Sequence, residues 1–278
     1  QTCALPISSS IKVMTFNVRV FDLYNWEGKH ELRKKIFEFL SKESPDIVCF
    51  QEYYTSESPT QGYRINDTLT KIIPTQYSHI FYSTTLHNNL DHWGIATFSK
   101  YPIVRKQAIY YRPKGRNAFL ETDIVVYTDT LRIINAHLES IRFKEEDYKF
   151  VENIANENQD EEINTGINML RKMKRAYAKR ARQVDVLKKE SSNSPYPIIV
   201  CGDFNDIPGS YTYSTIADGL VDSFRESGTG FGETYAGSMP SFRIDYILHS
   251  KQLKGTSYTT HHVNLSDHYP ISCLIERK

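Results

Sequence analysis

Short apolar segments divide the chain, and most of them end beside a polar side chain. The segments 11–20 (IKVMTFNVRV) and 46–50 (DIVCF) are rich in β-branched residues, as strands are. Similar runs cover 94–99, 103–111, 119–127, 131–138, 198–201, 242–248, 257–263 and 271–275. Short turns separate most of the runs in the middle of the chain, which favours antiparallel pairing there. A chain with this pattern is expected to be built on β-sheet.

Two stretches have the periodicity of helices. Between 29 and 41, Leu32, Ile36, Phe39 and Leu40 recur at steps of three and four. This helix lies between two predicted strands, so Asn17 and Glu52 are expected at the same edge of a sheet.

The second predicted helix covers about 170–189 and is strongly basic. Its charged residues are expected either to face solvent or to form a phosphate- or membrane-facing patch, and both interpretations stay open. Its predicted apolar face consists of Leu170, Met173, Tyr177, Ala181, Val184 and Leu187, and the other faces carry Arg171, Lys172, Lys174, Arg175, Lys179, Arg180 and Arg182.

Length and composition favour one mixed α/β domain over 11–278. The chain has 278 residues, of which 40% are hydrophobic and 24% charged. Residues 1–10 are interpreted as a foreign adapter sequence and linker. The acidic, Asn-rich stretch at about 139–166 is expected to be an insertion or a mobile excursion.

Charge and cysteine content exclude several classes of protein. A net charge of +1 does not suit a protein that mainly coats nucleic acid. Four cysteines are too few for a disulfide scaffold, and Cys49, Cys201 and Cys273 are expected to be buried thiols. No apolar run approaches the roughly 20 residues that cross a bilayer.

The polar residues beside the strands form an unusual set. Taken singly, an Asn or Asp at a strand end is most simply a turn or cap residue, and Asp206 is interpreted in that way. A carboxylate within a strand, such as Asp245, is costly to bury and needs a partner. The complete set is Asn17, Glu52, His137, Asp203, Asn205, Asp245, Asp267 and His268.

Together these residues favour one chemistry. Carboxylate and amide oxygens suit a hard cation such as Mg²⁺ or Mn²⁺, which would also bind a phosphate group. The chain lacks the HExxH and CxxC motifs of zinc sites, the GxxxxGK[ST] loop and the GxSxG elbow. Of the chemistries considered, metal-assisted hydrolysis of a phosphate ester is the one that remains.

The ordered series MTFNVR, DIVCFQE, NAHL, GDFN, RIDYIL and SDH resembles the endonuclease/exonuclease/phosphatase superfamily, which includes deoxyribonuclease-I-like enzymes. The resemblance runs from about residue 11 to residue 275. It implies a four-layer α/β/β/α sandwich with two mixed, mostly antiparallel sheets, whose strand ends converge on one cleft. It also implies a Mg²⁺ cofactor, with Mn²⁺ as the alternative.

The resemblance assigns a role to each residue. It makes Glu52 the principal metal ligand, assisted by Asn17 and Asp267. It makes Asp203 the residue that activates water and Asn205 the one that holds the scissile phosphate. His268 would neutralise that phosphate, with Asp245 as its partner, and His137 matches the nuclease, lipase and phosphatase branches.

The segments HWGIATFSKYPI, NAHLESIRF, SYTYSTI and SFRIDYILHS resemble more closely an uncharacterised bacterial group. Members of that group often carry membrane segments before the catalytic domain. The chain is therefore expected to be a monomeric part of an enzyme anchored in the bacterial cell envelope, rather than a cytoplasmic protein.

The substrate is less constrained than the bond that is cleaved. A phosphodiesterase acting on nucleic acid is expected first, with Arg112, Arg116 and Arg142 binding the substrate. The loop 110–116 is equally well a solvated hairpin connection. The aromatic groups of Tyr211, Tyr213, His92 and Trp93 either stack on a base, lie in a lipid interface or pack internally. A phosphomonoesterase or a lipid phosphodiesterase is the alternative. A catalytically silent interaction domain is a remote alternative, because every expected site position is intact.

Overall fold

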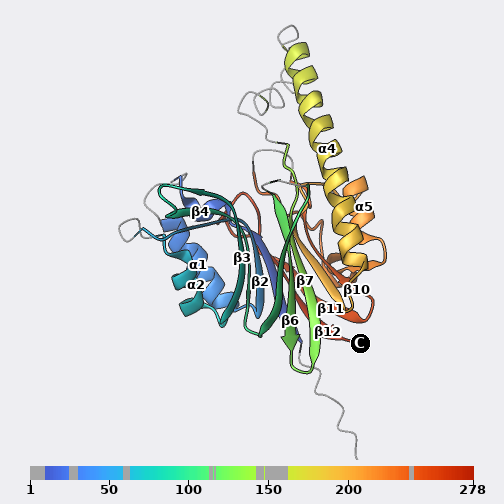
Figure 1. The fold of residues 1–278 in the computed structure, drawn as a ribbon. Coiled ribbons are helices and arrows are strands. Elements are labelled where there is room, and N and C mark those ends of the chain that lie inside the picture. The colour runs from blue at the N-terminus through green and yellow to red at the C-terminus, as the bar shows by residue number, and fades with distance from the viewer. Residues whose placement is uncertain are drawn as a thin grey trace, which may run out of the picture.

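Two six-stranded sheets pack face to face, and helices cover their outer faces (Figure 1). A computed structural model describes residues 10–24, 31–58, 63–112, 115, 117–141, 147, 162–237 and 241–278, with the side chains of 162–165 excepted. The first sheet has the order β11 (Leu253–Thr260), β12 (Ile271–Arg277), β1 (Ile11–Asn17), β2 (Ile47–Ser56), β4 (Asp91–Ser99) and β3 (Tyr77–Leu86).

The second sheet is covered by α4 (Glu162–Ser192) and α5 (Tyr211–Ala217), on the side of the molecule opposite to α1 (Glu31–Glu43) and α2 (Ile65–Ile72) (Figure 1). Its order is β5 (Ile103–Tyr110), β6 (Ala118–Val126), β7 (Asp129–His137), β8 (Ile198–Asp203), β10 (Asp245–Ser250) and β9 (Leu220–Asp222). Figure 1 shows α1 and α2 beside the first sheet, and α4 and α5 beside the second. A short helix, α6 (Ser223–Ser227), follows β9.

Three apolar cores hold these layers together. Ile36 and Leu40 of α1 pack against Phe16 and Phe50 of the first sheet. The inner faces of the two sheets form the middle core, and Val184 of α4 belongs to the third, on the outer face of the second sheet. Burial of apolar surface on both faces of each sheet explains the continuous apolar runs in the sequence. The four-layer architecture implied by the family resemblance is confirmed.

Each sheet contains one parallel pair of strands within an otherwise antiparallel arrangement. β1 pairs in parallel with β2 through α1, and β7 pairs in parallel with β8 through α4. Parallel neighbours need a long crossover, and a helix supplies it in both cases. As a result, the carboxyl ends of β1, β7 and β8 bring Asn17, His137 and Asp203 to one end of the sandwich, where Glu52 also lies, within β2.

A buried polar contact joins the sheets below that end. The Gln51 Nε2 donates to Asn135 Oδ1 at 2.7 Å, and the Asn135 Nδ2 donates to the carbonyl oxygen of Ala96 at 2.9 Å. Both side chains are completely buried. Because a buried amide without a partner is costly, these bonds favour one alignment of the two sheets.

Several element boundaries differ from the sequence prediction. The first strand ends at Asn17 rather than Val20, because residues Arg19–Asp22 form a turn with positive φ angles. β2 continues past Glu52 to Ser56, and β10 begins at Asp245 rather than Phe242. The short elements α2, β3, α5, β9 and α6 were not predicted, since their apolar residues are too few or too irregular to show a period.

The basic helix is longer than predicted, and its buried face agrees only in part with the prediction, since Val184 and Leu187 are completely buried as expected. Most of the predicted excursion at 139–166 lies outside the described residues, and α4 begins within it at Glu162. Leu170 and Tyr177, predicted to be on the apolar face, are 65% and 44% exposed, whereas Arg180 is completely buried. The prediction that Arg180 lies on a polar face was therefore wrong.

The predicted buried thiols are confirmed for Cys49, Cys201 and Cys273, which are free and buried. Cys3 and the predicted adapter sequence lie almost entirely outside the described residues. Within the described part of the chain, no helix is both long and apolar enough to cross a membrane.

We expect His79 to make folding stability depend on pH. Its Nδ1 lies 2.8 Å from Thr122 Oγ1 on the facing sheet, and burial, with a smaller effect of Lys106, lowers its pKa from 6.5 to about 4. The unfolded chain therefore binds a proton that the folded chain excludes, so stability falls as the pH drops from about 6.5 through 4.

Urea unfolding of the wild type and of His79→Gln at several pH values measures this effect. The wild type should lose more stability than the variant between pH 7 and pH 4, and the difference should vanish above pH 7.5. Parallel pH profiles for the two proteins would contradict the prediction.

Candidate active site

Three of the predicted residues lie in one row at the end of the second sheet. In the strand register, Asp203 of β8 is opposite His137 of β7 on one side and opposite Asp245 of β10 on the other. Residues paired in register direct their side chains to the same face of a sheet. The backbone pairing alone therefore brings these three side chains together.

The Asp203 carboxylate is the centre of the site. It is 1% exposed, and its Oδ2 accepts hydrogen bonds from Asn17 Nδ2 at 3.0 Å and from Asn205 Nδ2 at 3.1 Å. The main-chain N–H of Asn205 donates to the other oxygen, Oδ1, at 2.8 Å. His137 Nε2 lies 3.5 Å from Oδ2. Asn17 belongs to the first sheet, so the site spans both sheets.

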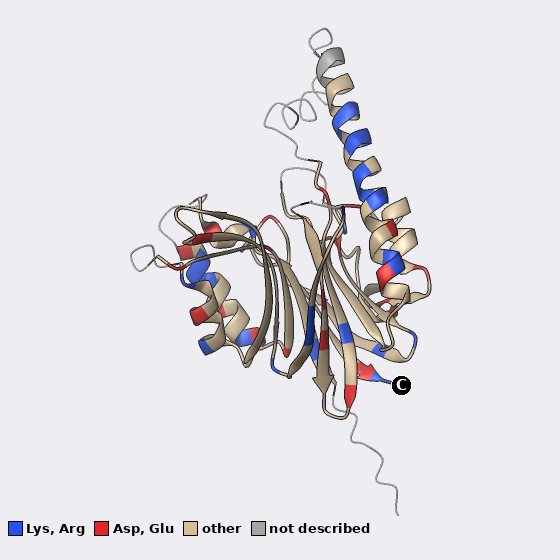
Figure 2. Ribbon diagram, in the orientation of Figure 1, with Lys and Arg blue, Asp and Glu red and all other residues tan. Residues whose placement is uncertain are grey.

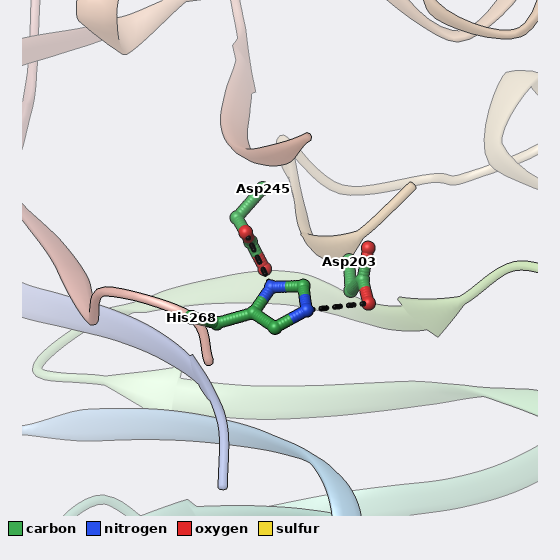
Figure 3. Close-up of side chains that lie close together, drawn as sticks. All are labelled: Asp203, Asp245 and His268. Carbon is green, nitrogen blue, oxygen red and sulfur yellow. Dashed lines mark hydrogen bonds and ion pairs between the residues drawn. The ribbon is translucent and has the colours of Figure 1, made fainter. Parts of the chain in front are cut away.

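Asp245 and His268 form a second buried group beside Asp203 (Figure 3). His268 Nδ1 lies 2.9 Å from Asp245 Oδ2, and its Nε2 lies 3.8 Å from Asp203 Oδ2. Burial alone would lower the pKa of His268, but the carboxylates of Asp245 and Asp203 raise it to about 10. The imidazole is therefore a cation at neutral pH.

Thr234 fixes the position of Asp245, a contact that no sequence pattern indicated. Its Oγ1 accepts hydrogen bonds from the main-chain N–H groups of Ile244 and Asp245, both at 3.0 Å. The carbonyl oxygen of Thr234 accepts from the N–H of Tyr269, next to His268, at 2.7 Å. Thr234 thus binds the backbone of Asp245 and of Tyr269, the residue that follows His268.

A β-bulge directs Glu52 into the site. The pairing of β2 with β4 jumps from Phe50–Ala96 to Tyr53–Gly94, so that Gln51 and Glu52 together face one residue. Glu52 has a φ of 49°, an unusual value for a residue other than glycine. Its Oε1 lies 4.0 Å from His137 Nε2, and its side chain is 41% exposed.

Asn17, which binds Asp203 through its side chain, is linked to Asp267 through Ser266. Ser266 Oγ donates to the carbonyl oxygen of Asn17 at 2.8 Å and lies 3.1 Å from Asp267 Oδ1. Arg19 Nε lies 3.6 Å from Asp267 Oδ2, and the Arg19 N–H donates to Asn17 Oδ1 at 3.2 Å. Sequence reasoning missed Arg19 and Ser266, because neither has a motif of its own.

Two surface hollows flank these residues. Glu52 and His137 line one of about 370 Å³, together with Phe81 and Trp93. Asp267 lines the other, of about 490 Å³, with Arg19 among its neighbours. The described residues of the first hollow include no lysine or arginine.

Of the three predicted substrate-binding arginines, Arg112 alone lies within the described residues. Arg112 is exposed, while Arg116 and Arg142 lie outside the described residues. Among the predicted aromatic candidates, Trp93 lines the first hollow. Tyr213 and His92 are buried, with Tyr213 bound to Asp222 and His92 stacked on Tyr82, and the exposed Tyr211 binds Asp185.

The donor atoms of the site fit a divalent cation. Glu52 offers the most exposed carboxylate, while Asn17 and Asp267 offer further oxygens, and oxygen ligands suit Mg²⁺ or Mn²⁺. One donor atom from each of Asp203, Asp245 and His268 also lies within 4.8 Å of the others, so this buried group could hold a metal as well. Its imidazole nitrogen suits a transition metal better than Mg²⁺.

Comparison with known proteins agrees with this arrangement. The family model described as "Endonuclease/Exonuclease/phosphatase family" matches residues 14–268, and the chain belongs to this family. A comparison with curated protein sequences gives no match. The fold and the site define a metal-dependent phosphoric ester hydrolase.

Solved structures of low sequence identity share the fold. An endonuclease/exonuclease/phosphatase from Beutenbergia cavernae is 16% identical with a TM-score of 0.70, covering 96% of this chain and 72% of its own. A truncated TDP2 from Caenorhabditis elegans is 16% identical with a TM-score of 0.62, covering 96% and 98%. A mannosyl-6-phosphatase from Bacteroides thetaiotaomicron is 15% identical with a TM-score of 0.65, covering 96% and 99%.

Metal binding should distinguish the two candidate ligand groups. We expect Glu52→Gln to weaken Mn²⁺ binding by about 10-fold or more, because it removes the only charge of the exposed ligand. Asp245→Asn, a change within the buried group, should weaken it much less. Glu57→Gln, at an exposed carboxylate just after β2, serves as the control.

Titration of each variant with Mn²⁺, followed by electron paramagnetic resonance of the free ion, measures this affinity. Loss of binding in Asp245→Asn, with normal binding in Glu52→Gln, would place the metal at the buried group instead.

Proposed function

We propose that this chain is a Mg²⁺-assisted phosphodiesterase that acts on nucleic acid, using a water molecule activated by Asp203. The observation that carries the proposal is the setting of the Asp203 carboxylate, which is buried yet surrounded by Asn17, Asn205, His137 and His268. These groups hold the carboxylate in one orientation at the point where both sheets end.

Asp203 is suited to orient a water molecule and to accept its proton. Its Oδ2 accepts hydrogen bonds from the two amide groups of Asn17 and Asn205, and His268 Nε2 lies 3.8 Å from the same oxygen. A positioned general base of this kind contributes typically about 10²–10⁴-fold to the rate. The proton moves from water to Asp203 Oδ2, and the water oxygen forms a bond to phosphorus while the P–O bond to one ester group breaks. That group leaves as an alkoxide, which takes a proton from solvent.

His268 and His137 are suited to stabilise the phosphate as negative charge grows on its oxygens. The Nδ1 of His268 is committed to Asp245, so its Nε2 faces the site. His137 is 28% exposed at its side chain and lines the first hollow. Donors already in place at the developing charge require little reorganisation during the reaction.

Asn205 is more constrained than its expected role of phosphate ligand suggests. Its Nδ2 donates both to Asp203 Oδ2 and to the carbonyl oxygen of Leu138 at 3.0 Å. Contact with a phosphate would require one of these bonds to be exchanged. A divalent ion held by Glu52, Asn17 and Asp267 would supply Lewis-acid stabilisation of the phosphate.

The first hollow supports a diester rather than a monoester. A phosphodiester carries one negative charge and two organic groups, whereas a monoester approaches two charges. The described walls of this hollow offer Phe81 and Trp93 but no cationic side chain. Aromatic walls of this kind can stack on a nucleobase.

The structural neighbours include a mannosyl-6-phosphatase as well as TDP2. Fold likeness at about 15% identity does not transfer a substrate. A phosphomonoesterase and a lipid phosphodiesterase remain the alternatives to be assayed. We propose for the full-length protein a monomer anchored in the bacterial cell envelope, as its sequence resemblance implies.

The proposed function is tested by assaying the purified protein with Mg²⁺ and with Mn²⁺. The substrates are plasmid DNA, an abasic duplex, inositol phosphates, sphingomyelin and bis(p-nitrophenyl) phosphate. We expect turnover of the diesters that is abolished by chelation. Asp203→Ala and Glu52→Ala should each lower kcat by about 10²-fold or more, because they remove the base and a metal ligand.

Glu57→Gln is the matched control and should retain wild-type turnover. Absence of metal-dependent turnover on every substrate would contradict the enzyme assignment. Full activity in both alanine variants would contradict the assignment of the site.

Trp93 should contribute to substrate binding. It lines the first hollow and contacts Tyr54, with ring centroids 4.9 Å apart. We expect Trp93→Leu to raise the KM for bis(p-nitrophenyl) phosphate about 10-fold, since stacking is worth about 1–3 kcal/mol per base or ring. The KM for a dialkyl phosphate should change less. Equal changes for both esters, or none for either, would exclude a stacking role.

A further inference from the structure

The helix α4 carries a completely buried arginine. Figure 2 shows the basic residues of this helix, several of them on the half that extends beyond the sheets. Arg180 differs from those residues, because it is 0% exposed, like Val184 and Leu187 further along α4, which belong to the core on the outer face of the second sheet. Burial of a charged guanidinium is costly unless its hydrogen bonds are satisfied by specific partners.

The first partner is Asp206, the residue that follows Asn205. Arg180 Nε lies 3.0 Å from Asp206 Oδ2, and Asp206 is only 5% exposed. The carbonyl oxygen of Asp206 lies 2.8 Å from the hydroxyl of Tyr246, which anchors the same turn from β10. The sequence interpretation of Asp206 as a simple turn residue therefore missed a buried ion pair.

The second partner is Glu139, two residues after His137. Arg180 Nη1 donates to the carbonyl oxygen of Glu139 at 2.9 Å, and the main-chain N–H of Glu139 donates to Gln183 Oε1 at 2.9 Å. Its carboxylate binds Lys179 Nζ at 2.7 Å. Three neighbouring side chains of α4 thus engage every polar group of Glu139 and hold the segment that leaves β7.

These two partners belong to the two loops that carry the reacting groups. The Leu138 N–H donates to the carbonyl oxygen of Asp203 at 3.0 Å, and Asn205 Nδ2 donates to the carbonyl oxygen of Leu138 at 3.0 Å. The loops after β7 and β8 are therefore bound to each other, and Arg180 binds one residue of each loop, Glu139 and Asp206.

We propose that Arg180 is a positioning residue for the reaction and that Asp206 is its partner. The pair sets His137 and Asn205 at fixed distances from Asp203, without touching the substrate itself. The inference rests on the proposed function for its kinetic consequence, but the geometry that it describes can be measured separately.

The planar guanidinium explains why arginine occupies this position. Its Nε and Nη1 point to two acceptors that lie on different loops, Asp206 and Glu139. A lysine has a single charged nitrogen and cannot reproduce this fork. Apolar residues of similar size would fill the same space at little cost in stability, but would give no directional bond to either loop.

The double variant Arg180→Met/Asp206→Leu tests the proposal, because it removes both charges of the ion pair together and also removes the bond from Arg180 to the carbonyl oxygen of Glu139. Arg182→Met, an exposed arginine on the same helix, is the matched control. We expect the double variant to keep a thermal midpoint close to wild type. Its kcat should fall about 10–100-fold, as a displacement near 1 Å in a catalytic group produces, with a smaller change in KM.

Hydrogen exchange provides a readout that needs no activity. The N–H groups of Leu138 and Asn205 are bonded to Asp203, and the N–H of Glu139 is bonded to Gln183 of α4. Exchange at these amides should become at least about 10-fold faster in the double variant, and stay unchanged in Arg182→Met. Unchanged exchange together with a kcat within twofold of wild type would overturn the proposal.

Arg180→Lys keeps the positive charge beside Asp206 and is the variant to measure if the double variant does not fold. It should fold and still show faster exchange at Glu139 with reduced kcat, and wild-type values of both would overturn the proposal. If the wild-type protein hydrolyses none of the substrates, the proposed function fails while hydrogen exchange still decides the role of Arg180.

Discussion

The site depends on the burial of one carboxylate between two sheets. Asp203 is 1% exposed, and an ionised group at that depth is tolerated only where donors surround it. One of those donors, Asn17, comes from the opposite sheet, so the charge of Asp203 also holds the two sheets in contact. The sandwich and the candidate catalytic centre are thus stabilised by the same hydrogen bonds.

Further polar contacts extend this arrangement. The hydrogen bond between Gln51 and Asn135 aligns the two sheets, and Thr234 binds Asp245 and the segment of His268. The bulge at Glu52 adds an exposed carboxylate to a site whose other acids are more deeply buried. A rigid base with one accessible ligand suits a metal that must also accept a substrate phosphate.

A shared fold with different substrates is consistent with where the site lies. Its proposed reacting groups stand at strand ends and on the short turns beside them, which the packed sheets hold in place. The first hollow is bordered by Tyr24, Asn117 and Ser140, which lie outside the strands. Loops of this kind vary more freely than the sheets, so one arrangement of catalytic residues can act on several phosphate esters.

Much of the fold was predictable, because strand and helix periods are local properties. The strands at 94–99, 119–127 and 131–138 and the helix at 29–41 were found within a few residues of their true ends. Errors arose where a contact overrides the local pattern. The strand at Asn17 stops at a turn with positive φ angles, and β2 runs on because β4 pairs with it beyond the bulge.

The sequence by itself determined which chemical groups are present and their order along the chain, from Asn17 to His268. It also supported the family, because six short motifs in one order are specific although each alone is weak. Only the tertiary structure decided which groups meet. Asn17 and Asp203 are 186 positions apart, and Arg180 reaches Asp206 across 26. A buried arginine and an exposed one have the same local pattern, since burial depends on which distant surface the helix covers.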